Sequence, residues 1–110
     1  AVMTPDIDEP HATDRSARIG VRDKFGDSRF EAVLDEEIIG ILLYQRPPGT
    51  LELIHTVTDP EHRHEGAASA LVRTALAEAR AQHLQVVVVC PFVESWLRRH
   101  PEQTDGIVRD

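Results

Sequence analysis

The stretch DPEHRHEGAA at residues 59–68 decides how this sequence folds, because it separates strand periodicity from helix periodicity. Before it, the side chains of residues 51–58 fall alternately on two opposite faces, and this period of two predicts a β-strand. Pro60 ends that strand, since proline cannot donate to a ladder. After Gly66, apolar residues recur at helical spacing, at Ala68, Leu71, Val72, Ala75, Leu76 and Ala79. The stretch is therefore a loop that leads from a strand into an amphipathic helix.

A second strand and a second helix follow this helix. His83 is a residue type that tolerates left-handed backbone, so we expect the first helix to end there. Residues 86–89 are four valines, which predicts a buried strand, and a strand, helix and strand in this order form a parallel, right-handed βαβ unit. Pro91 suits the first position of a helix. Val93, Trp96, Leu97 and His100 share its face, Pro101 marks its end, and we expect an irregular tail from Glu102 onward.

Strand patterns also fill the sequence before the loop. Residues 1–18 lack apolar periodicity, and we expect a flexible tail there. Period-two patterns then predict strands around residues 19–21 and 30–34, and the apolar run at 38–44 predicts a central strand. Together with residues 51–58 these make four antiparallel strands. The predicted domain, residues 19–110, is thus an α/β (α+β) fold with a mixed sheet of five to six strands and two main helices.

Composition limits the classes of function. The 110 residues suit one domain, and a net charge of −7 opposes binding to nucleic acid. The one cysteine, Cys90, cannot form an internal disulfide, and no apolar run is long enough to span a membrane. The N-terminus shows no signal-peptide pattern, so we expect a cytoplasmic protein. We further expect a monomer or a weak homodimer.

The loop carries the chemistry that is easiest to interpret. Gly66, Ala67 and Ala68 have no bulky side chains, so a pyrophosphate could approach the free N–H groups at the helix N-terminus. Arg63 and His64 add positive charge in an acidic chain. Two alternatives stay open: the small residues merely begin an alanine-rich helix, or His62 and His64 bind a metal with Glu61 or Glu65. We expect no metal requirement, since no further ligands lie nearby in the sequence.

Several motifs resemble the minimal, single-domain branch of the GNAT superfamily. Arg63, Gly66 and Ala68 match the fixed positions of its acyl-CoA signature, and the pair His55-Thr56 matches the strand before it. The sequences CPFV at residues 90–93 and HPE at 100–102 match motifs near its end. The resemblance covers nearly all of residues 19–102. The chain departs from the pattern at Trp96, where tyrosine is common, and at His83, where glycine is usual.

The resemblance implies a cofactor site. In GNAT-like folds the strand before the loop splays from the next parallel strand, and its free backbone groups pair with the pantetheine arm of acetyl-CoA. By resemblance these groups belong to Thr56, Val57 and Thr58. The pyrophosphate would bind the loop, formed by Arg63, His64, Glu65, Gly66, Ala67 and Ala68. Trp96 would pack on the pantetheine or acyl group, with a plain core position as the alternative.

Cys90 and His55 are the candidate catalytic residues. Cys90 directly precedes a helix, where the dipole favours a reactive thiolate, and in this branch the cysteine lies near the thioester. The alternative is that Cys90 behaves as a small buried hydrophobe. His55 could act as a base toward the acceptor or toward Cys90. Since it shares the apolar face of Leu53 and Val57, we favour a buried core histidine.

The predicted function is therefore acetyl-CoA-dependent N-acetyl transfer. The acceptor would be an amine or a protein. The sequence does not identify it, because the chain lacks the helical pair that often shapes the acceptor pocket in larger relatives. The alternative function is a non-catalytic acyl-CoA-binding module that docks a partner protein. That module would need Arg63 and Gly66 but neither His55 nor Cys90.

Overall fold

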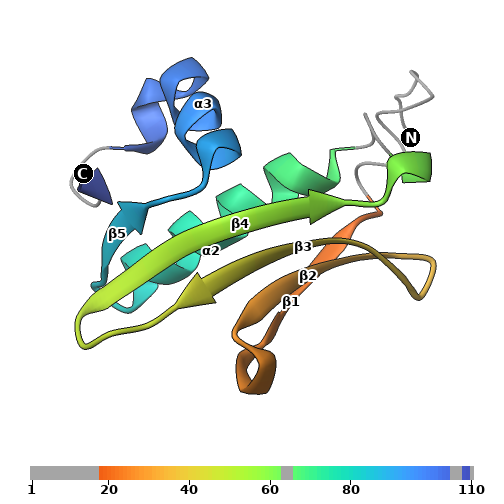
Figure 1. Cartoon of the computed structure of the whole chain (residues 1–110), viewed down its shortest axis with the longest axis horizontal. Helices are drawn as coiled ribbons and strands as arrows, with labels where there is room; N and C mark the ends of the chain where they lie inside the picture. Colours follow the sequence, from red (N-terminus) through yellow and green to blue (C-terminus); the bar gives the residue numbers. More distant parts are fainter. Residues whose placement is uncertain (1–17, 63–65, 105–107, 110) are drawn as a thin grey trace, which may run out of the picture.

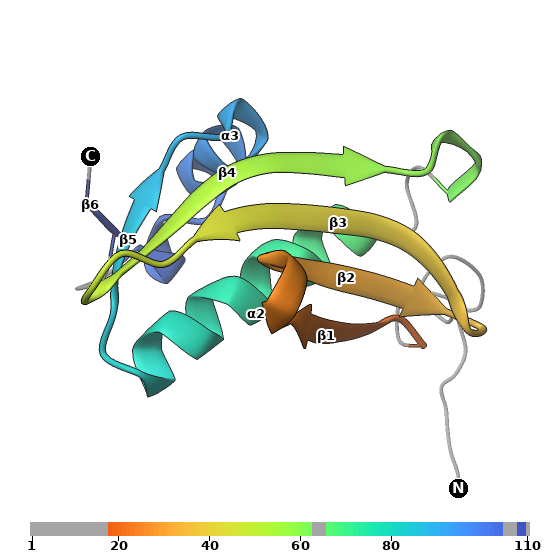
Figure 2. The ribbon, with the colours of Figure 1, turned by 60° about the horizontal axis from the view of Figure 1, so that its bottom comes forward.

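The fold is one mixed sheet with two α-helices, as a computed structural model shows for residues 18–62, 66–104 and 108–109. Strands β1 to β6 lie in sequence order; β1 to β4 pair antiparallel, and β4, β5 and β6 pair parallel (Figure 1; β6 is labelled in Figure 2). The predicted fold class is confirmed. The strands are β1 (Gly20–Lys24), β2 (Arg29–Leu34), β3 (Glu37–Gln45), β4 (Thr50–Thr58), β5 (Gln85–Val88) and β6 (Val108–Arg109). The helices are α2 (Ala67–Ala81) and α3 (Pro91–Arg99), with short 3-10 turns η2 (Phe25–Asp27), η3 (Pro60–His62) and η4 (Pro101–Gln103).

The antiparallel strands are joined by tight connections. Asp35 and Glu36 both have positive φ, 52° and 69°, as a two-residue hairpin of the primed type requires. Phe30, Ala32 and Leu34 alternate along β2 and are buried, which agrees with the predicted period of two. These strands therefore form as the sequence pattern predicts.

Helix α2 packs across β1 to β5 on one face of the sheet (Figure 2). Its apolar stripe lies in the core as predicted, except that Ala67 is buried while Ala68 is half-buried. A Cβ at Gly40 would lie 3.5 Å from the Ala67 Cβ and 3.3 Å from the Val57 carbonyl oxygen, so glycine lets the helix approach β3 closely. His83 has a φ of 59°, which confirms the left-handed residue after the helix.

Two predictions about the C-terminal part were wrong. The valine strand is not buried throughout: Val86 is fully buried, but Val89 lies beyond β5 and is 58% exposed. The sequence after Glu102 is not wholly irregular either, since β6 adds a parallel strand beside β5. Four consecutive β-branched residues give no period from which to tell a buried face from an open one. A two-residue strand is too short to leave any pattern.

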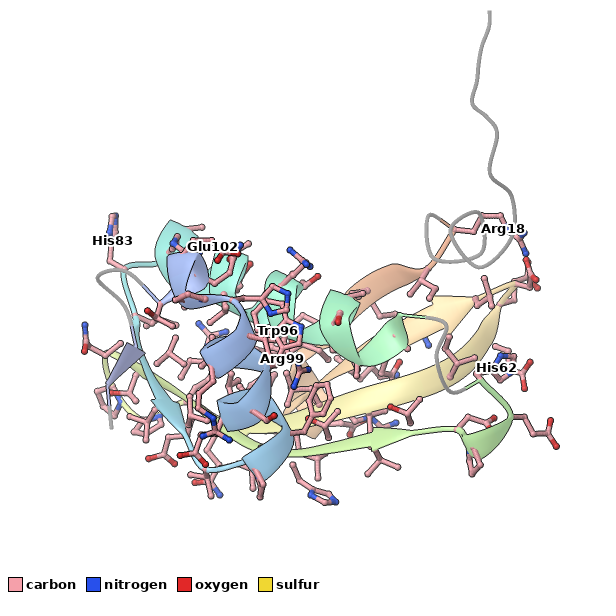
Figure 3. The ribbon with its side chains drawn as sticks, turned by 90° about the horizontal axis from the view of Figure 1, so that it is seen from above. Arg18, His62, His83, Trp96, Arg99 and Glu102 are labelled. Atoms are coloured by element: carbon pink, nitrogen blue, oxygen red, sulfur yellow. The ribbon has the colours of Figure 1, made fainter. Side chains whose placement is uncertain are left out.

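Both helices lie on the same face of the sheet (Figure 3), and no described helix covers the other face. Neither α2 nor α3 is long and apolar enough to cross a membrane. On the helix-free face, Glu31 accepts hydrogen bonds from Arg22 and Arg29, at 2.7 Å and 2.9 Å, and is 1% exposed. The Arg22 hydrogen bond, supported by Arg29, lowers the pKa of Glu31 although desolvation opposes this.

Candidate functional site

The site begins at a β-bulge in β4. Leu53 pairs with Tyr44 and His55 pairs with Leu43, so Ile54 is the extra residue on β4. The bulge exchanges the two faces of the strand. Leu53 is fully buried against the helices, whereas beyond the bulge Thr56 turns inward and His55 is exposed. The predicted continuation of the apolar face through His55 and Val57 was therefore wrong.

Strands β4 and β5 separate at the bulge. Their parallel pairing runs only from Thr50↔Gln85 to Leu53↔Val88. The Leu53 carbonyl then accepts the N–H groups of both Val89 and Cys90, at 2.9 Å and 3.0 Å. Figure 1 shows β4 continuing well past the end of β5. The second half of β4 thus lies beside α3 without a ladder partner in β5.

Alternation shows which backbone groups face this open edge. The Asp59 N–H donates to the Ile39 carbonyl in β3, and Val57 pairs with Ile41 in the same ladder. The backbone groups of Val57 therefore point toward β3. Those of Thr56 and Thr58 point the other way, toward the open edge. Of the three predicted backbone contacts, these two are available for a bound molecule.

The N-terminus of α2 lies beside this edge. Gly66 precedes the helix with a φ of 92°, a conformation that strains any residue with a side chain. Adjacent to it is a pocket of about 360 Å³ that joins β4, α2 and α3. Its lining residues are Thr58, His62, Gly66, Ala67, Ala68, Ser69, Phe92 and Arg99. The small residues and the N–H groups of the first helical turn, which have no partners within the helix, suit an anionic group.

The profile of the GCN5-related N-acetyl-transferase family matches residues 29–106, which include the bulge, the open edge, α2 and α3. The chain belongs to this family. The mixed sheet with its splay between β4 and β5 is thus a GNAT fold, and the protein is an acetyltransferase relative. Members of this family typically use acetyl-CoA as the acyl donor.

Two solved structures align with part of this chain. Ard1 from Thermoplasma volcanium aligns with a TM-score of 0.50 and 20% identity over 57% of this chain and 44% of its own. An acetyltransferase from Vibrio fischeri aligns with a TM-score of 0.46 and 18% identity over 56% of this chain and 59% of its own. This GNAT domain therefore spans less than two thirds of either relative. No curated protein sequence matches it significantly.

Cys90 lies at the start of α3, as predicted. It is the N-cap residue before Pro91, and its side chain is 2% exposed. Its Sγ lies 3.3 Å from the Thr56 Oγ1. Cys90 is therefore buried, as expected of a small hydrophobe, and adjacent to the open edge, as expected of a catalytic thiol. The structure agrees with both interpretations.

The structure separates His55 from Cys90. His55 is exposed on the helix-free face, whereas Cys90 contacts Thr56 on the helix face of the same strand. The interpretation of His55 as a buried core histidine was wrong, because the bulge turns its side chain outward. For the same reason His55 is not placed to accept a proton from the Cys90 thiol.

Trp96 fills the contact between α2 and α3 (Figure 3). It is fully buried, its Nε1 donates to the Ser69 Oγ at 3.0 Å, and its ring stacks on His100 with centroids 4.0 Å apart. The Arg73 guanidinium lies 5.2 Å from its ring centroid. These contacts account for Trp96 as a core residue, and its contact with a cofactor stays a prediction.

Sequence reasoning missed Arg99 and Phe92, which both line the pocket. Arg99 donates to the Ser95 Oγ at 2.9 Å, one turn earlier on α3. A basic residue in the last turn of a helix is ordinarily explained by the helix dipole, so its position gave no sign of a site. Among the predicted loop residues, Arg63, His64 and Glu65 lie outside the described residues.

One group of side chains has the composition of a metal site. Ligand atoms of Glu37, Asp59 and His62 lie within 4.8 Å of one another. The Glu61 N–H orients Asp59 by donating to its Oδ1 at 2.9 Å, and the His62 Nε2 lies 3.9 Å from the Glu37 Oε1. Of the metal-binding alternative that the sequence left open, this set contains His62, and the hairpin turn before β3 brings Glu37 beside it.

Proposed function

We propose that the protein is an acetyl-CoA-dependent N-acetyltransferase that acts on an amine acceptor. One observation carries the proposal: the unpaired edge of β4 leads directly to the N-terminus of α2. An extended amide-containing arm and a pyrophosphate at its end need these two features side by side. An edge of free N–H and C=O groups binds the arm, and a helix N-terminus binds the phosphates.

The described residues supply the donor site in two parts. The backbone groups of Thr56 and Thr58 would pair with the pantetheine arm, and their N–H groups, on either side of Val57, are available to polarise the thioester carbonyl. Gly66 to Ala68 would hold the pyrophosphate. Arg99 provides positive charge at the same pocket, where the sequence also predicts Arg63 and His64.

The amine would approach from the helix-free face. No described helix covers that face, and β1 and β2 are joined only by the short turn η2. An uncovered approach suits a large or flexible acceptor better than an enclosed small molecule. His55 is exposed there, two residues before Val57, where it could accept a proton from an ammonium group. The net charge of −7 favours a cationic acceptor.

The alternative function, a non-catalytic acyl-CoA-binding module, has one observation in its favour. His55 and Cys90 lie on opposite faces of β4, so the two predicted catalytic side chains form no pair. A binding module would keep the pocket and the edge but release no CoA. An enzyme that transfers the acetyl group directly to an amine would use the same pocket and edge, and would differ from the module only by releasing CoA.

The test measures acetyl-CoA binding by calorimetry and CoA release with polyamine and peptide amines. We expect binding in the wild type, loss of binding in Gly66→Val, and CoA release that depends on the amine. Circular dichroism checks that Gly66→Val remains folded, since its positive φ strains the variant. Arg63→Ala should weaken binding, more strongly at low salt. Binding without release under any acceptor would favour the module, and wild-type affinity in folded Gly66→Val would reject the site.

The route of transfer is tested at Cys90. In covalent transfer, intact mass spectrometry after incubation with acetyl-CoA shows one hydroxylamine-sensitive acetyl group that is absent from Cys90→Ala. In direct transfer, Cys90→Ala keeps appreciable turnover with the amine and no adduct forms. We favour the covalent route, because Cys90 begins α3 beside the open edge. If Cys90→Ala turns over and the wild type forms no adduct, the amine attacks the thioester directly.

A further inference from the structure

Thr56 and Cys90 meet across the gap where β4 and β5 separate. The distance between the Thr56 Oγ1 and the Cys90 Sγ is 3.3 Å, and either atom could be the donor. Cys90 is 2% exposed and Thr56 is half-buried. A hydroxyl within hydrogen-bond distance of a buried sulfur affects the balance between its thiol and thiolate forms.

Backbone structure holds the two side chains together. The bulge at Ile54 turns Thr56 toward the helices. The Leu53 carbonyl, three residues earlier on the same strand, accepts the N–H groups of Val89 and Cys90. Both partners are thus positioned by main-chain hydrogen bonds of the sheet, and only their side-chain rotamers remain adjustable.

The direction of the hydrogen bond depends on the state of the sulfur. A thiol and a hydroxyl can each donate to the other, but a thiolate has no proton, so Thr56 must then be the donor. Hydrogen bonds to ionised acceptors are roughly twice as strong as those between neutral groups. The contact therefore stabilises the thiolate more than the thiol. The Cys90 side chain makes no capping hydrogen bond in α3, so its sulfur is not engaged there.

We propose that Thr56 is a positioning residue that donates its hydroxyl hydrogen to the Cys90 Sγ and thereby favours the thiolate. Its value for catalysis rests on the proposed covalent transfer. In that step the thiolate sulfur forms a bond to the acetyl carbonyl carbon, and the bond from this carbon to the CoA sulfur breaks. The electron pair leaves on the CoA sulfur, which takes a proton from water. Thr56 keeps its own proton throughout.

The experiment follows alkylation of the unliganded protein by iodoacetamide between about pH 6 and 10. Cys90 is the one cysteine of the chain, so mass spectrometry reports on it alone. Thr56→Val removes the hydroxyl and keeps the shape, whereas Thr56→Ser keeps the hydroxyl. Thr50→Val makes the same change at the other end of β4 and is the matched control.

We expect the midpoint of the pH profile to rise by about one pH unit in Thr56→Val and to stay near the wild-type value in Thr56→Ser and Thr50→Val. A change in access to the buried sulfur would scale the rate at every pH without moving the midpoint. An unchanged midpoint in Thr56→Val would overturn the proposal, whatever happens to the absolute rate.

Incubation with acetyl-CoA separates this proposal from the proposed function. If both hold, the acetyl adduct on Cys90 forms up to about tenfold more slowly at neutral pH in Thr56→Val, because the thiolate fraction falls. A shifted alkylation midpoint with no adduct in the wild type would support the hydrogen bond and reject covalent transfer. If the adduct forms and Thr56→Val changes neither its rate of formation nor the midpoint of the alkylation profile, covalent transfer is supported and the role of Thr56 is rejected.

Discussion

The antiparallel and parallel parts of the sheet use the same strand, β4, in different ways. Toward β3, β4 pairs along nearly its whole length, from Glu52 to Thr58, with one bulge. Toward β5, its pairing ends at Leu53. One edge of the strand holds the fold together, and half of the other edge remains open beside α2 and α3.

This difference shows how a small domain can hold an extended ligand. A fully paired parallel ladder would use every backbone group of β4, whereas a shortened one leaves groups of Thr56 and Thr58 available. The antiparallel side keeps the strand in place while the other edge is open. Stability and binding should therefore respond to different residues, even to neighbours on one strand.

The largest expected effect is on stability, at the centre of the antiparallel part. Leu42 is fully buried under α2, and Leu42→Ala should lower the free energy of unfolding by about 2–5 kcal/mol through lost burial and a cavity. Leu43→Ala, on the opposite face and half-buried, should cost clearly less. Urea unfolding measures both. Equal losses would show that the two faces of β3 are not distinct.

Proline substitutions on β4 compare its two edges directly. Val57→Pro removes an N–H that faces β3 and leaves a ladder carbonyl unpaired, which should cost roughly 1–3 kcal/mol of stability. Thr58→Pro removes an N–H on the open edge, so its stability should change little. Its acetyl-CoA affinity should instead fall about tenfold or more. Urea unfolding measures the stability of both variants, and calorimetry measures their affinity for acetyl-CoA. A large loss of stability in Thr58→Pro would contradict the open edge.

A smaller effect is expected at the pocket between α2 and α3. Arg99→Ala should weaken acetyl-CoA binding by about 1 kcal/mol, roughly fivefold, since Arg99 lines the pocket but is exposed, so that its interaction is screened. The effect should shrink at high salt. Arg98→Ala is the matched control, because Arg98 is 70% exposed and pairs only loosely with Glu94 at 4.0 Å. Equal effects of the two variants would remove Arg99 from the site.

The smallest effect concerns pH and lies on the helix-free face of the antiparallel part. The pKa of Glu31 is lowered in the folded protein by the Arg22 and Arg29 hydrogen bonds. A lowered pKa stabilises the fold above the ordinary value of 4.5, and this contribution is lost as the pH falls through the folded pKa. Stability should thus decline with acid below about pH 4.5, and less steeply in Glu31→Gln.

Asp35→Asn is the control for this pH dependence. Asp35 also pairs with an arginine, Arg18, at 2.9 Å, but its side chain is 70% exposed. An exposed pair contributes little, so Asp35→Asn should keep the wild-type slope of unfolding free energy against pH. Thermal unfolding across the acid range measures all three proteins. Parallel slopes for Glu31→Gln and the wild type would show that the buried carboxylate carries no linkage.

Local patterns determined most of the fold. Alternation placed Phe30, Ala32 and Leu34 inward, helical spacing placed Leu71 and its neighbours in the core, and Pro91 marked the start of α3. The stretch at residues 59–68 located the helix N-terminus and, by resemblance, the family. These signals are local because each depends on side-chain periodicity or on backbone restriction within a few residues.

Only the tertiary structure decided how the site is arranged. The bulge at Ile54 has no sequence signal, yet it reverses which residues of β4 face the helices and so separates His55 from Cys90. The contact of Thr56 with Cys90 and the place of Arg99 in the pocket join segments far apart in the chain. The register between strands and the packing of α3 set these positions, because neither is encoded in the period of a single segment.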